Sequence, residues 1–288
     1  MAVVQDRSAS SRFADFATVA ILFFASFVVV IPVLQIVLQS FSATSDLVPK
    51  VVSIDAYRYI FSSNILGNSL LVSVYITVLG TALSLILSSL MAYSLSYRSL
   101  PGRSGILFVV LFTMLFNGGI IPTYMVVRAT GVMNSLWALV IPNAINAFYL
   151  IVMKNFFQNI PEELRDSAKI DGCHELVVLL RIVMPLSLPA MAAFGLFYAV
   201  DRWNLWFHAL LYIADSRKWP VQVVLQQVIF TSVGAVGQQT SDSNDMVAYT
   251  SQGIRAAVII IATLPIALVY PFLQKHFVKG LLVGSIKG

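Results

Sequence analysis

The chain has 288 residues, of which 58% are hydrophobic and only 11% are charged, and its mean hydropathy is +0.85. An average soluble domain carries roughly 25% charged residues, so this composition excludes an ordinary soluble protein and indicates an integral membrane protein. The net charge is +5, but the basic residues are spread along the chain and not clustered with stacking aromatics, which argues against a nucleic-acid-binding surface.

Six apolar stretches are long enough to cross a bilayer, since a helix rising about 1.5 Å per residue needs about 20 apolar residues. They cover residues 16–40, 67–95, 105–127, 135–157, 177–213 and 254–277. The sequence therefore predicts an all-α integral membrane protein with six transmembrane helices. We find no soluble domain, linker or internal repeat, and expect one transmembrane domain over residues 1–288.

The first stretch, 16–40, resembles a secretory signal peptide in its position. Its apolar run is longer than the roughly 7–15 residues of a signal-peptide core, and no small-residue cleavage site follows it. We expect this stretch to be a membrane span.

Proline and glycine residues predict irregular spans. Three prolines fall inside apolar stretches and should kink them: Pro32, Pro142 and Pro265. The run 116–119 (Phe-Asn-Gly-Gly) predicts a break in the third span, which serves either a close helix contact or a bend that faces a cavity. The fifth stretch is too long for one crossing, and Pro185 and Pro189 should divide a lead-in segment from the span itself.

The polar segment between the fourth and fifth stretches predicts a short amphipathic helix at about residues 160–172. Asn159 stands in an N-cap position, Glu162 follows in capping-box spacing, and Gly172 offers a C-terminal stop. The apolar side of this helix repeats every four residues, at Ile160, Leu164 and Ala168.

This segment resembles a motif of binding-protein-dependent ABC importers: Glu-Ala-Ala, three residues, Gly, nine residues, then Ile-x-Leu-Pro. The chain has Asp-Ser-Ala at 166–168, then Gly172, then Ile-Val-Met-Pro at 182–185. The spacing is intact, and the three departures are modest changes of size or polarity. Further segments look like the carbohydrate-uptake branch of this family: Trp203-Asn204, Leu264-Pro265 and 279–288. The run 116–119 is similar to the subgroup that handles oligosaccharides and polysaccharide fragments.

The resemblance implies a permease subunit of a type I ABC importer, in which the helix 160–172 is a cytoplasmic coupling helix that docks on a separate ATPase. The residues that would contact the ATPase are Glu162, Glu163, Arg165, Asp166, Ala168, Lys169, Asp171 and Gly172. The implied partners are an ATPase dimer, a second and usually different permease chain, a periplasmic or extracellular solute-binding protein, and membrane lipid.

The sequence contains no G-x-x-x-x-G-K-[ST] loop for binding phosphates. We therefore expect a non-catalytic chain that binds no cofactor itself, with ATP and Mg held by the partner ATPase. His174-Glu175 opens like a zinc-binding H-E-x-x-H motif, but the second histidine is missing, so no metal site is expected. The single cysteine, Cys173, cannot form an internal disulfide.

Six spans place both termini on the same side of the membrane. Cytoplasmic termini leave more Lys and Arg on the inner side than on the outer side, as the positive-inside rule favours. This orientation in the bacterial cytoplasmic (inner) membrane puts the helix 160–172 inside and makes residues 214–253 the longest outer loop. In that loop, Trp219-Pro220 followed by an apolar segment predicts a short interfacial helix.

The fifth span combines charges with aromatic rings. An unpaired charge near the centre of a bilayer costs at least about 2.5–3.5 kcal/mol, so Asp201 and Arg202 should each face a partner helix or a water-filled path. Stacking rings and hydrogen-bonding groups are what an oligosaccharide pathway needs. The candidate pathway residues are Asn143, Asn146, Tyr149, Tyr198, Asp201, Arg202, Trp203, Asn204 and Trp206. The same residues equally fit the alternative, in which they fasten helices together.

Arg202 in a span and Arg217-Lys218 at the outer mouth would suit an acidic oligosaccharide such as alginate, because arginine pairs well with carboxylates. Two rival functions remain. An ion-coupled secondary transporter would need an intramembrane ion-coupling site and usually inverted repeats, whereas the only charges well inside a predicted span are Asp201 and Arg202 and no repeat is apparent. An intramembrane enzyme would need a nucleophile or metal set, and the sequence shows none.

Overall fold

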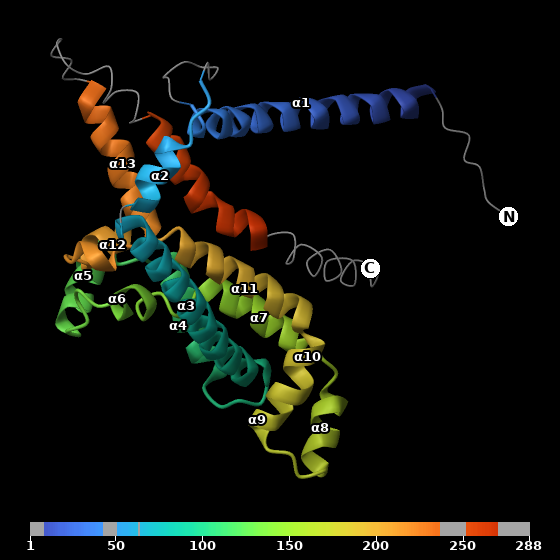
Figure 1. The fold of residues 1–288 in the computed structure, drawn as a ribbon. Coiled ribbons are helices and arrows are strands. Elements are labelled where there is room, and N and C mark those ends of the chain that lie inside the picture. Colours follow the sequence, from blue (N-terminus) through green and yellow to red (C-terminus); the bar gives the residue numbers. More distant parts are fainter. Residues whose placement is uncertain (1–8, 43–50, 63, 237–251, 270–288) are drawn as a thin grey trace. The chain divides into compact units, whose positions relative to one another are not determined.

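The computed structural model describes residues 9–42, 51–62, 64–236 and 252–269 (Figure 1). These residues form helices and connecting turns, with one isolated bridge between Ser42 and Val52. The prediction of an all-α membrane protein is confirmed. Contacts divide the chain into two compact units, residues 1–63 with 228–261 and residues 64–227 with 262–288.

The first unit contains α1 (Ala9–Ser40), α2 (Asp55–Ser62) and most of the helix Gln252–Val269. α1 continues through Pro32 without a break. Its end is joined to α2 by a hydrogen bond of 2.9 Å from the Tyr57 hydroxyl to Ser40 Oγ. Within the described residues, none of the most apolar window of α1 is buried, so lipid or another chain must cover this helix in a membrane.

The core of the second unit is made by α3 (Asn64–Ser96), α7 (Ala147–Gln158) and α11 (Leu188–Trp203), which pack side by side (Figure 1). α3 buries a row of small hydroxyl residues on one face, including Ser73, Ser84 and Ser88. Small residues let membrane helices approach closely, and this is why α3 can lie between two partners.

The third, fourth and fifth apolar stretches are each interrupted. The third stretch forms α4 (Arg103–Leu115) and α5 (Ile120–Ala129), broken at Asn117 and Gly119 as the Phe-Asn-Gly-Gly run predicts. The Asn117 side chain accepts a hydrogen bond from the Gly119 N–H, and Gly119 has φ +86°, which favours glycine. The fourth stretch forms α6 (Trp137–Val140) and α7, with Pro142 in the turn between them.

The fifth stretch begins with a lead-in of α9 (Glu175–Val178), the π-helical turn η1 (Leu179–Val183) and α10 (Met184–Leu186). This lead-in meets α11 at an angle of 88°, with Ser187 at the bend between Pro185 and Pro189. The two prolines thus mark the division that the sequence predicts. α12 (Phe207–Tyr212), the 3-10 turn η2 (Ser216–Lys218) and α13 (Val221–Val236) follow.

Three described helices are long and apolar enough to cross a membrane alone: Asp15–Ser40, Ile65–Ser96 and Gln252–Val269. The bent pair of the fifth stretch adds a fourth span if it crosses as one element. The chain is therefore built as a multi-pass membrane protein. The count of six spans stays a prediction, because the third and fourth stretches are divided into shorter helices. Residues 237–251 of the predicted outer loop lie outside the described residues.

Candidate functional site

The helix expected near residues 160–172 is α8 (Glu162–Ile170), a nine-residue helix between α7 and α9. Its N-cap is Pro161, which makes no side-chain capping bond. The prediction that Asn159 caps this helix is wrong, because Asn159 instead ends α7, with its N–H bonded to the carbonyls of that helix. Glu162 and Glu163 in the first turn still favour the positive end of the helix dipole.

Gly172 ends α8 with φ +80°. The Cys173 N–H bonds to the Ala168 carbonyl at 2.9 Å and the Gly172 N–H bonds to the Lys169 carbonyl at 3.0 Å. These two bonds form a Schellman motif, which requires a left-handed residue at the position of Gly172. The stop predicted from the sequence therefore has a defined geometry, which turns the chain from α8 into α9.

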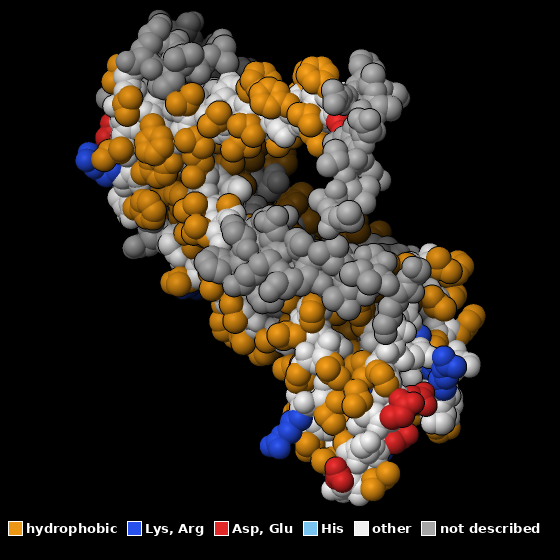
Figure 2. All heavy atoms as spheres, turned by 90° about the vertical axis from the view of Figure 1, so that its right-hand side faces the viewer, with side chains coloured by type: hydrophobic (Ala, Val, Ile, Leu, Met, Phe, Trp, Pro, Cys, Tyr) orange, Lys and Arg blue, Asp and Glu red, His pale blue; other side chains and the backbone are white. Residues whose placement is uncertain are grey.

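The outer face of α8 mixes charge with apolar surface. Most of the predicted ATPase-contact residues are exposed on it: Glu162, Glu163, Asp166, Lys169, Asp171 and Gly172. Leu164 and Ile170 are also exposed, by 46% and 86%. Figure 2 shows charged and apolar side chains together at the end of the second unit that carries α8. An apolar patch rimmed by charges is typical of a surface that meets another protein.

Two of the predicted ATPase-contact residues face the other way. Arg165 is 3% exposed and Ala168 is 7% exposed, because both pack into the chain's own core. The sequence pattern placed Leu164 on the buried side and Arg165 outside, and the structure reverses these two positions. Arg165 and Ala168 therefore lie on the buried side of α8 and do not form part of its outer face.

A second candidate site lies where α7 meets α11. The Tyr149 hydroxyl donates a hydrogen bond of 3.0 Å to an oxygen of Asp201. The Tyr149 ring stacks on Phe197, with centroids 5.6 Å apart and an interplanar angle of 22°. Asp201 is exposed and Tyr149 is half-buried. This arrangement places aromatic rings beside an exposed carboxylate.

Arg202, the neighbour of Asp201, is buried, and its hydrogen-bond partners differ from those of Asp201. Its Nη1 donates to the Leu139 carbonyl at 2.6 Å, and its Nη2 donates to the Asn143 carbonyl and to Ser84 Oγ at 3.2 Å. The last four carbonyls of any helix lack intrahelical partners, and the break after α6 leaves such groups inside the membrane protein. Arg202 supplies the missing donors, so it fastens the α6–α7 break to α3 and α11.

Tyr198 and Trp203 are also buried and hydrogen-bonded within the chain. The Tyr198 hydroxyl lies 2.7 Å from Ser88 Oγ and accepts the Asn146 N–H at 3.1 Å. Trp203 Nε1 donates to the Ala262 carbonyl at 2.9 Å. The prediction that Tyr198, Arg202 and Trp203 line a pathway is therefore not supported by their positions. The candidates that keep exposed or half-buried positions are Asn143, Asn146, Tyr149, Asp201, Asn204 and Trp206.

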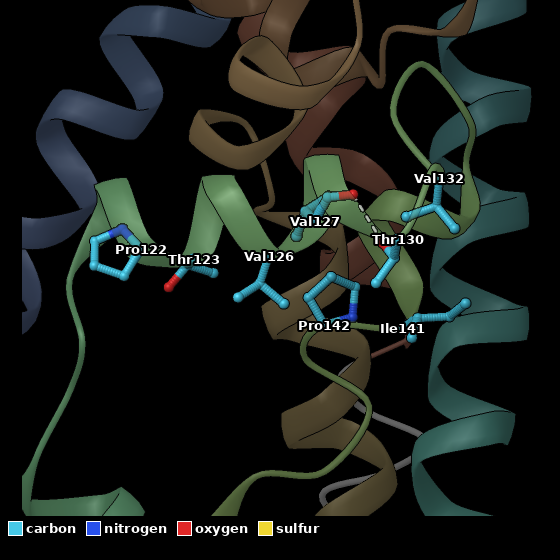
Figure 3. A pocket seen from close by; sticks show the side chains of 8 residues that line it. All are labelled: Pro122, Thr123, Val126, Val127, Thr130, Val132, Ile141 and Pro142. Atoms are coloured by element: carbon cyan, nitrogen blue, oxygen red, sulfur yellow. Dashed lines mark hydrogen bonds between the residues drawn. The ribbon is translucent and has the colours of Figure 1, made fainter.

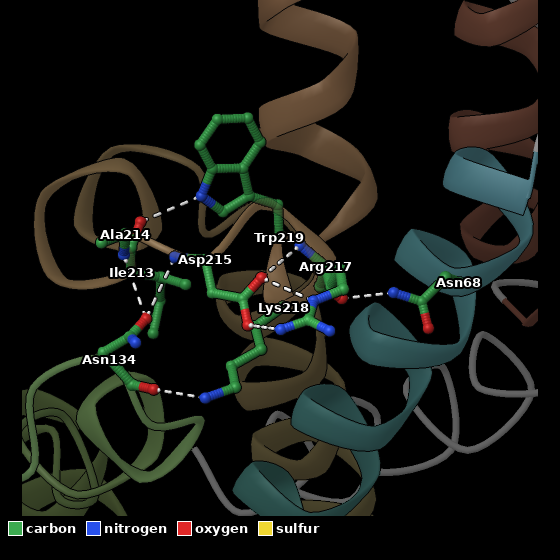
Figure 4. A network of polar contacts seen from close by, with 8 residues as sticks. All are labelled: Asn68, Asn134, Ile213, Ala214, Asp215, Arg217, Lys218 and Trp219. Carbon is green, nitrogen blue, oxygen red and sulfur yellow. Dashed lines mark hydrogen bonds and ion pairs between the residues drawn. The ribbon is translucent and has the colours of Figure 1, made fainter.

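The turn Asp215–Lys218 in the predicted outer loop is held by a polar network (Figure 4). Asp215 pairs with Arg217 through two hydrogen bonds of 3.1 Å, and these bonds hold the pKa of the Asp215 carboxyl below its ordinary value. Lys218 Nζ donates to the Asn134 carbonyl at 2.8 Å, and Asn134 Oδ1 accepts the N–H groups of Ala214 and Asp215. Both predicted mouth cations are thus engaged inside the chain.

A cavity of about 550 Å³ lies between α5 and the α6–α7 break (Figure 3). Its lining is apolar except for two threonines. The Thr123 hydroxyl bonds to the Gly119 carbonyl at 2.7 Å, and the Thr130 hydroxyl bonds to the Val127 carbonyl at 2.8 Å. With these hydroxyls engaged, the lining offers few partners for sugar hydroxyls, and we do not assign this cavity to a sugar.

Known proteins are similar to this chain over nearly its whole length. The chain is 50% identical over 285 residues, covering 96% of this chain and 99% of the relative, to the polygalacturonan/rhamnogalacturonan transport system permease protein YtcP of Bacillus subtilis (strain 168). It is also 50% identical over 268 residues to the protein LplC of the same organism, covering 91% and 90% of the two chains.

The chain belongs to the family of sugar ABC transporter permeases.

A solved structure agrees with this family. A chain of a bacterial ABC transporter involved in the import of the acidic polysaccharide alginate is 27% identical to this permease, with a TM-score of 0.85. The match covers 94% of this permease and 99% of that chain. No family model matches the permease.

The sequence did not predict the residues of the permease that pack around Arg165 of α8. Tyr93 lies in the last turn of α3 and Tyr97 follows that helix, and both contact the Arg165 guanidinium. Glu175, at the start of α9, accepts hydrogen bonds from both tyrosine hydroxyls. The spacing of the two tyrosines by four residues at the end of a predicted span was a usable signal, because i and i+4 side chains share a helix face.

Proposed function

We propose that this permease forms half of the translocation pathway of an ATP-driven oligosaccharide importer, and that α8 is the coupling helix through which a separate ATPase drives alternating access. The observation that carries this proposal is the outer face of α8. It combines a glycine-closed helix end, a rim of charges, and exposed Leu164 and Ile170. A short rigid helix with such a face is suited to docking in a cleft and moving with it.

The proposal assigns residues 1–288 to one permease domain with both termini in the cytoplasm. Its partners are a second permease chain, an ATPase dimer that binds ATP and Mg, and a solute-binding protein outside. Support for this set of partners comes from YtcP, which is named as the permease of a transport system, and from the ABC transporter involved in alginate import. In this orientation α8 lies in the cytoplasm, and the turn Asp215–Lys218 lies outside.

The experiment that tests the assembly is purification of a tagged copy from its native host in mild detergent, followed by mass spectrometry of the bound proteins. We expect an ATPase and a second permease to stay bound, and uptake by the reconstituted complex to require ATP. Recovery of the permease alone, together with uptake driven by an ion gradient, would support the secondary-transporter alternative and contradict the proposal.

We further propose that the Tyr149–Asp201 pair lines the sugar pathway. The support is that both side chains reach the surface of the chain, and that the stacked Tyr149 and Phe197 rings lie beside the carboxylate. A charge at an exposed position in a span must meet water or a polar partner. Asn204, one turn further along and exposed, adds amide groups near the end of the same helix.

Replacing Asp201 with asparagine should lower uptake by about tenfold, because a hydrogen bond to a charged group contributes roughly 1.5–3 kcal/mol. The substitution is nearly isosteric, and its amide oxygen still accepts from Tyr149. The measurement is the initial rate of oligosaccharide uptake into proteoliposomes. Asp55→Asn is the matched control, since Asp55 is exposed and pairs with Arg58 in the first unit. Normal uptake with reduced thermal stability would instead place Asp201 at a helix interface.

For the substrate, we propose an acidic oligosaccharide such as alginate or another uronate chain. The support comes from two similar proteins, one a polygalacturonan/rhamnogalacturonan transport system permease and the other part of an ABC transporter involved in the import of the acidic polysaccharide alginate. The three cations that first suggested an acidic ligand, Arg202, Arg217 and Lys218, are engaged in contacts within the chain. We therefore assign the recognition of acid groups mainly to the solute-binding protein or the second permease.

A further inference from the structure

A connected set of side chains joins α8 to three other helices. We name this set the α8 clasp: Tyr93, Tyr97, Arg165, Lys169 and Glu175. Arg165 and Lys169 belong to α8. Tyr93 lies at the end of α3, and Tyr97 is the residue that follows this helix. Glu175 is the first residue of α9. All five lie in the second unit of the chain.

Arg165 is the buried centre of the clasp. Its Nη1 donates to Ser96 Oγ at 3.0 Å, and its Nη2 donates to the Phe157 carbonyl. Ser96 is the last residue of α3, and Phe157 lies in the last turn of α7. The guanidinium carbon also lies 5.3 Å from the centroid of the Tyr97 ring. A planar guanidinium fixes several donors at once, so one side chain ties α8 to the ends of two core helices.

Lys169 and Glu175 make the second connection. Lys169 Nζ lies 2.7 Å from Glu175 Oε1 and 4.5 Å from the centroid of the Tyr97 ring. The hydrogen bond to Glu175 raises the pKa of the Lys169 ammonium. Glu175 Oε2 accepts hydrogen bonds from the Tyr93 and Tyr97 hydroxyls, and the two hydroxyl oxygens lie 2.7 Å apart. A single exposed ion pair contributes little, but a shared network with a buried arginine restricts the position of every member.

These contacts have a mechanical consequence. α8 is joined to its neighbours along the chain by a turn at Pro161 and by the Schellman turn at Gly172. The clasp adds a second connection between α8 and the core, because it contacts α8 at the buried Arg165 and, four residues further on, at the partly exposed Lys169. A force on the outer face of α8 therefore reaches α3, α7 and α9 through side chains as well as through the backbone.

We propose that the α8 clasp, with Arg165 as its positioning residue, carries the movement of α8 into α3, α7 and α9. This inference rests on the proposed function of α8 as a coupling helix. It assigns to Arg165 a role inside the permease, where the sequence had suggested a contact with the ATPase.

The test uses the whole transporter, purified through a tag on this permease and reconstituted in proteoliposomes. Arg165→Met removes the hydrogen bonds and keeps an unbranched side chain. Arg165→Lys keeps the charge without the planar fork. Arg181→Met is the matched control, because Arg181 is exposed on η1. Three quantities are measured for each variant: the amount of ATPase that co-purifies, the rate of ATP hydrolysis, and the oligosaccharide imported per ATP hydrolysed.

We expect Arg165→Met to keep its ATPase and to hydrolyse ATP, while import per ATP falls by about tenfold or more, in the usual range of coupling free energies. Arg165→Lys should recover part of the loss, and Arg181→Met should behave as wild type. If Arg165→Met does not fold, Tyr97→Phe gives the same test. This variant removes only the hydroxyl that donates a hydrogen bond to Glu175. We expect its loss of import per ATP to be smaller than that of Arg165→Met.

Two results would overturn the clasp. Loss of the ATPase from Arg165→Met would make Arg165 a partner contact, and unchanged import per ATP in both Arg165→Met and Tyr97→Phe would remove any role in transmission. A wild-type preparation that contains no ATPase would overturn the proposed function itself. That result is visible before any variant is compared, so the two failures are distinguishable.

Discussion

Replacing Arg202 with methionine is expected to destabilise the permease by about 2–5 kcal/mol. The change leaves the carbonyls of Leu139 and Asn143 and the Ser84 hydroxyl without their donor. A hydrogen bond to a charged group contributes about 1.5–3 kcal/mol in water-soluble proteins and about 0.6–1.7 kcal/mol between membrane helices. For a chain of this size, the midpoint of thermal unfolding should fall by roughly 5–15 °C. Size-exclusion chromatography of detergent-solubilised protein after heating measures this shift.

Two glycines on α3 provide a matched control for the Arg202 contact. A Cβ added at Gly80 would lie 3.1 Å from Arg202 Nε, whereas a Cβ added at Gly67 meets no atom within 4 Å. Gly80→Ala should therefore lower stability and Gly67→Ala should not. The double variant Gly80→Ala with Arg202→Met should lose less stability than the sum of the losses of the two single variants, because both substitutions act on one contact. An Arg202→Met variant as stable as wild type would show that the arginine does not fasten these helices.

Replacing Gly172 with valine is expected to uncouple ATP hydrolysis from uptake without preventing membrane insertion. Gly172 has φ +80°, which costs other L-residues roughly 1–2 kcal/mol and a β-branched residue more. A Cβ at this position meets no atom within 4 Å, so the effect comes from the backbone and not from a clash inside the chain. The strain should change the direction in which α8 joins α9. We expect uptake per ATP in proteoliposomes to fall by about tenfold or more.

The controls for Gly172 separate backbone strain from side-chain size. Gly172→Asn adds a side chain of similar size, but asparagine tolerates the left-handed region, so this variant should retain most of its coupling. Gly105→Val adds the same side chain as Gly172→Val in the helical region of α4, also where no atom lies within 4 Å. Unchanged transport by Gly172→Val, or equal losses in the valine and asparagine variants, would contradict the role of the left-handed turn.

Features governed by local chemistry could be predicted from the sequence. The position of α8, the stop at Gly172, the break at residues 116–119 and the bend between Pro185 and Pro189 each follow from residue types that restrict the backbone. Such restrictions act within a few residues, so they can be recognised without knowledge of the fold. The number of spans was harder to predict, because hydropathy does not reveal where a long apolar stretch leaves the helical conformation.

The direction of individual side chains could not be predicted, because it depends on distant partners. Adjacent residues on a helix point about 100° apart, so Asp201 and Arg202 had to face different surroundings, but the sequence could not say which faced the core. The acceptors of Arg202 are mainly backbone carbonyls far along the chain, and these have no signature in side-chain composition. Arg165 was misplaced for the same reason, since its partners are Ser96 and a carbonyl of α7.

The contact of Arg202 with backbone carbonyls makes the α6–α7 break unevenly sensitive to mutation. A main-chain oxygen is present whatever side chain its residue carries, so substitutions at Leu139 or Asn143 leave these two acceptors in place. A substitution can therefore remove these two hydrogen bonds almost only if it replaces Arg202 itself. This asymmetry is experimentally useful, because Asn143→Ala can test the contribution of the exposed amide to transport while the attachment between the helices stays intact.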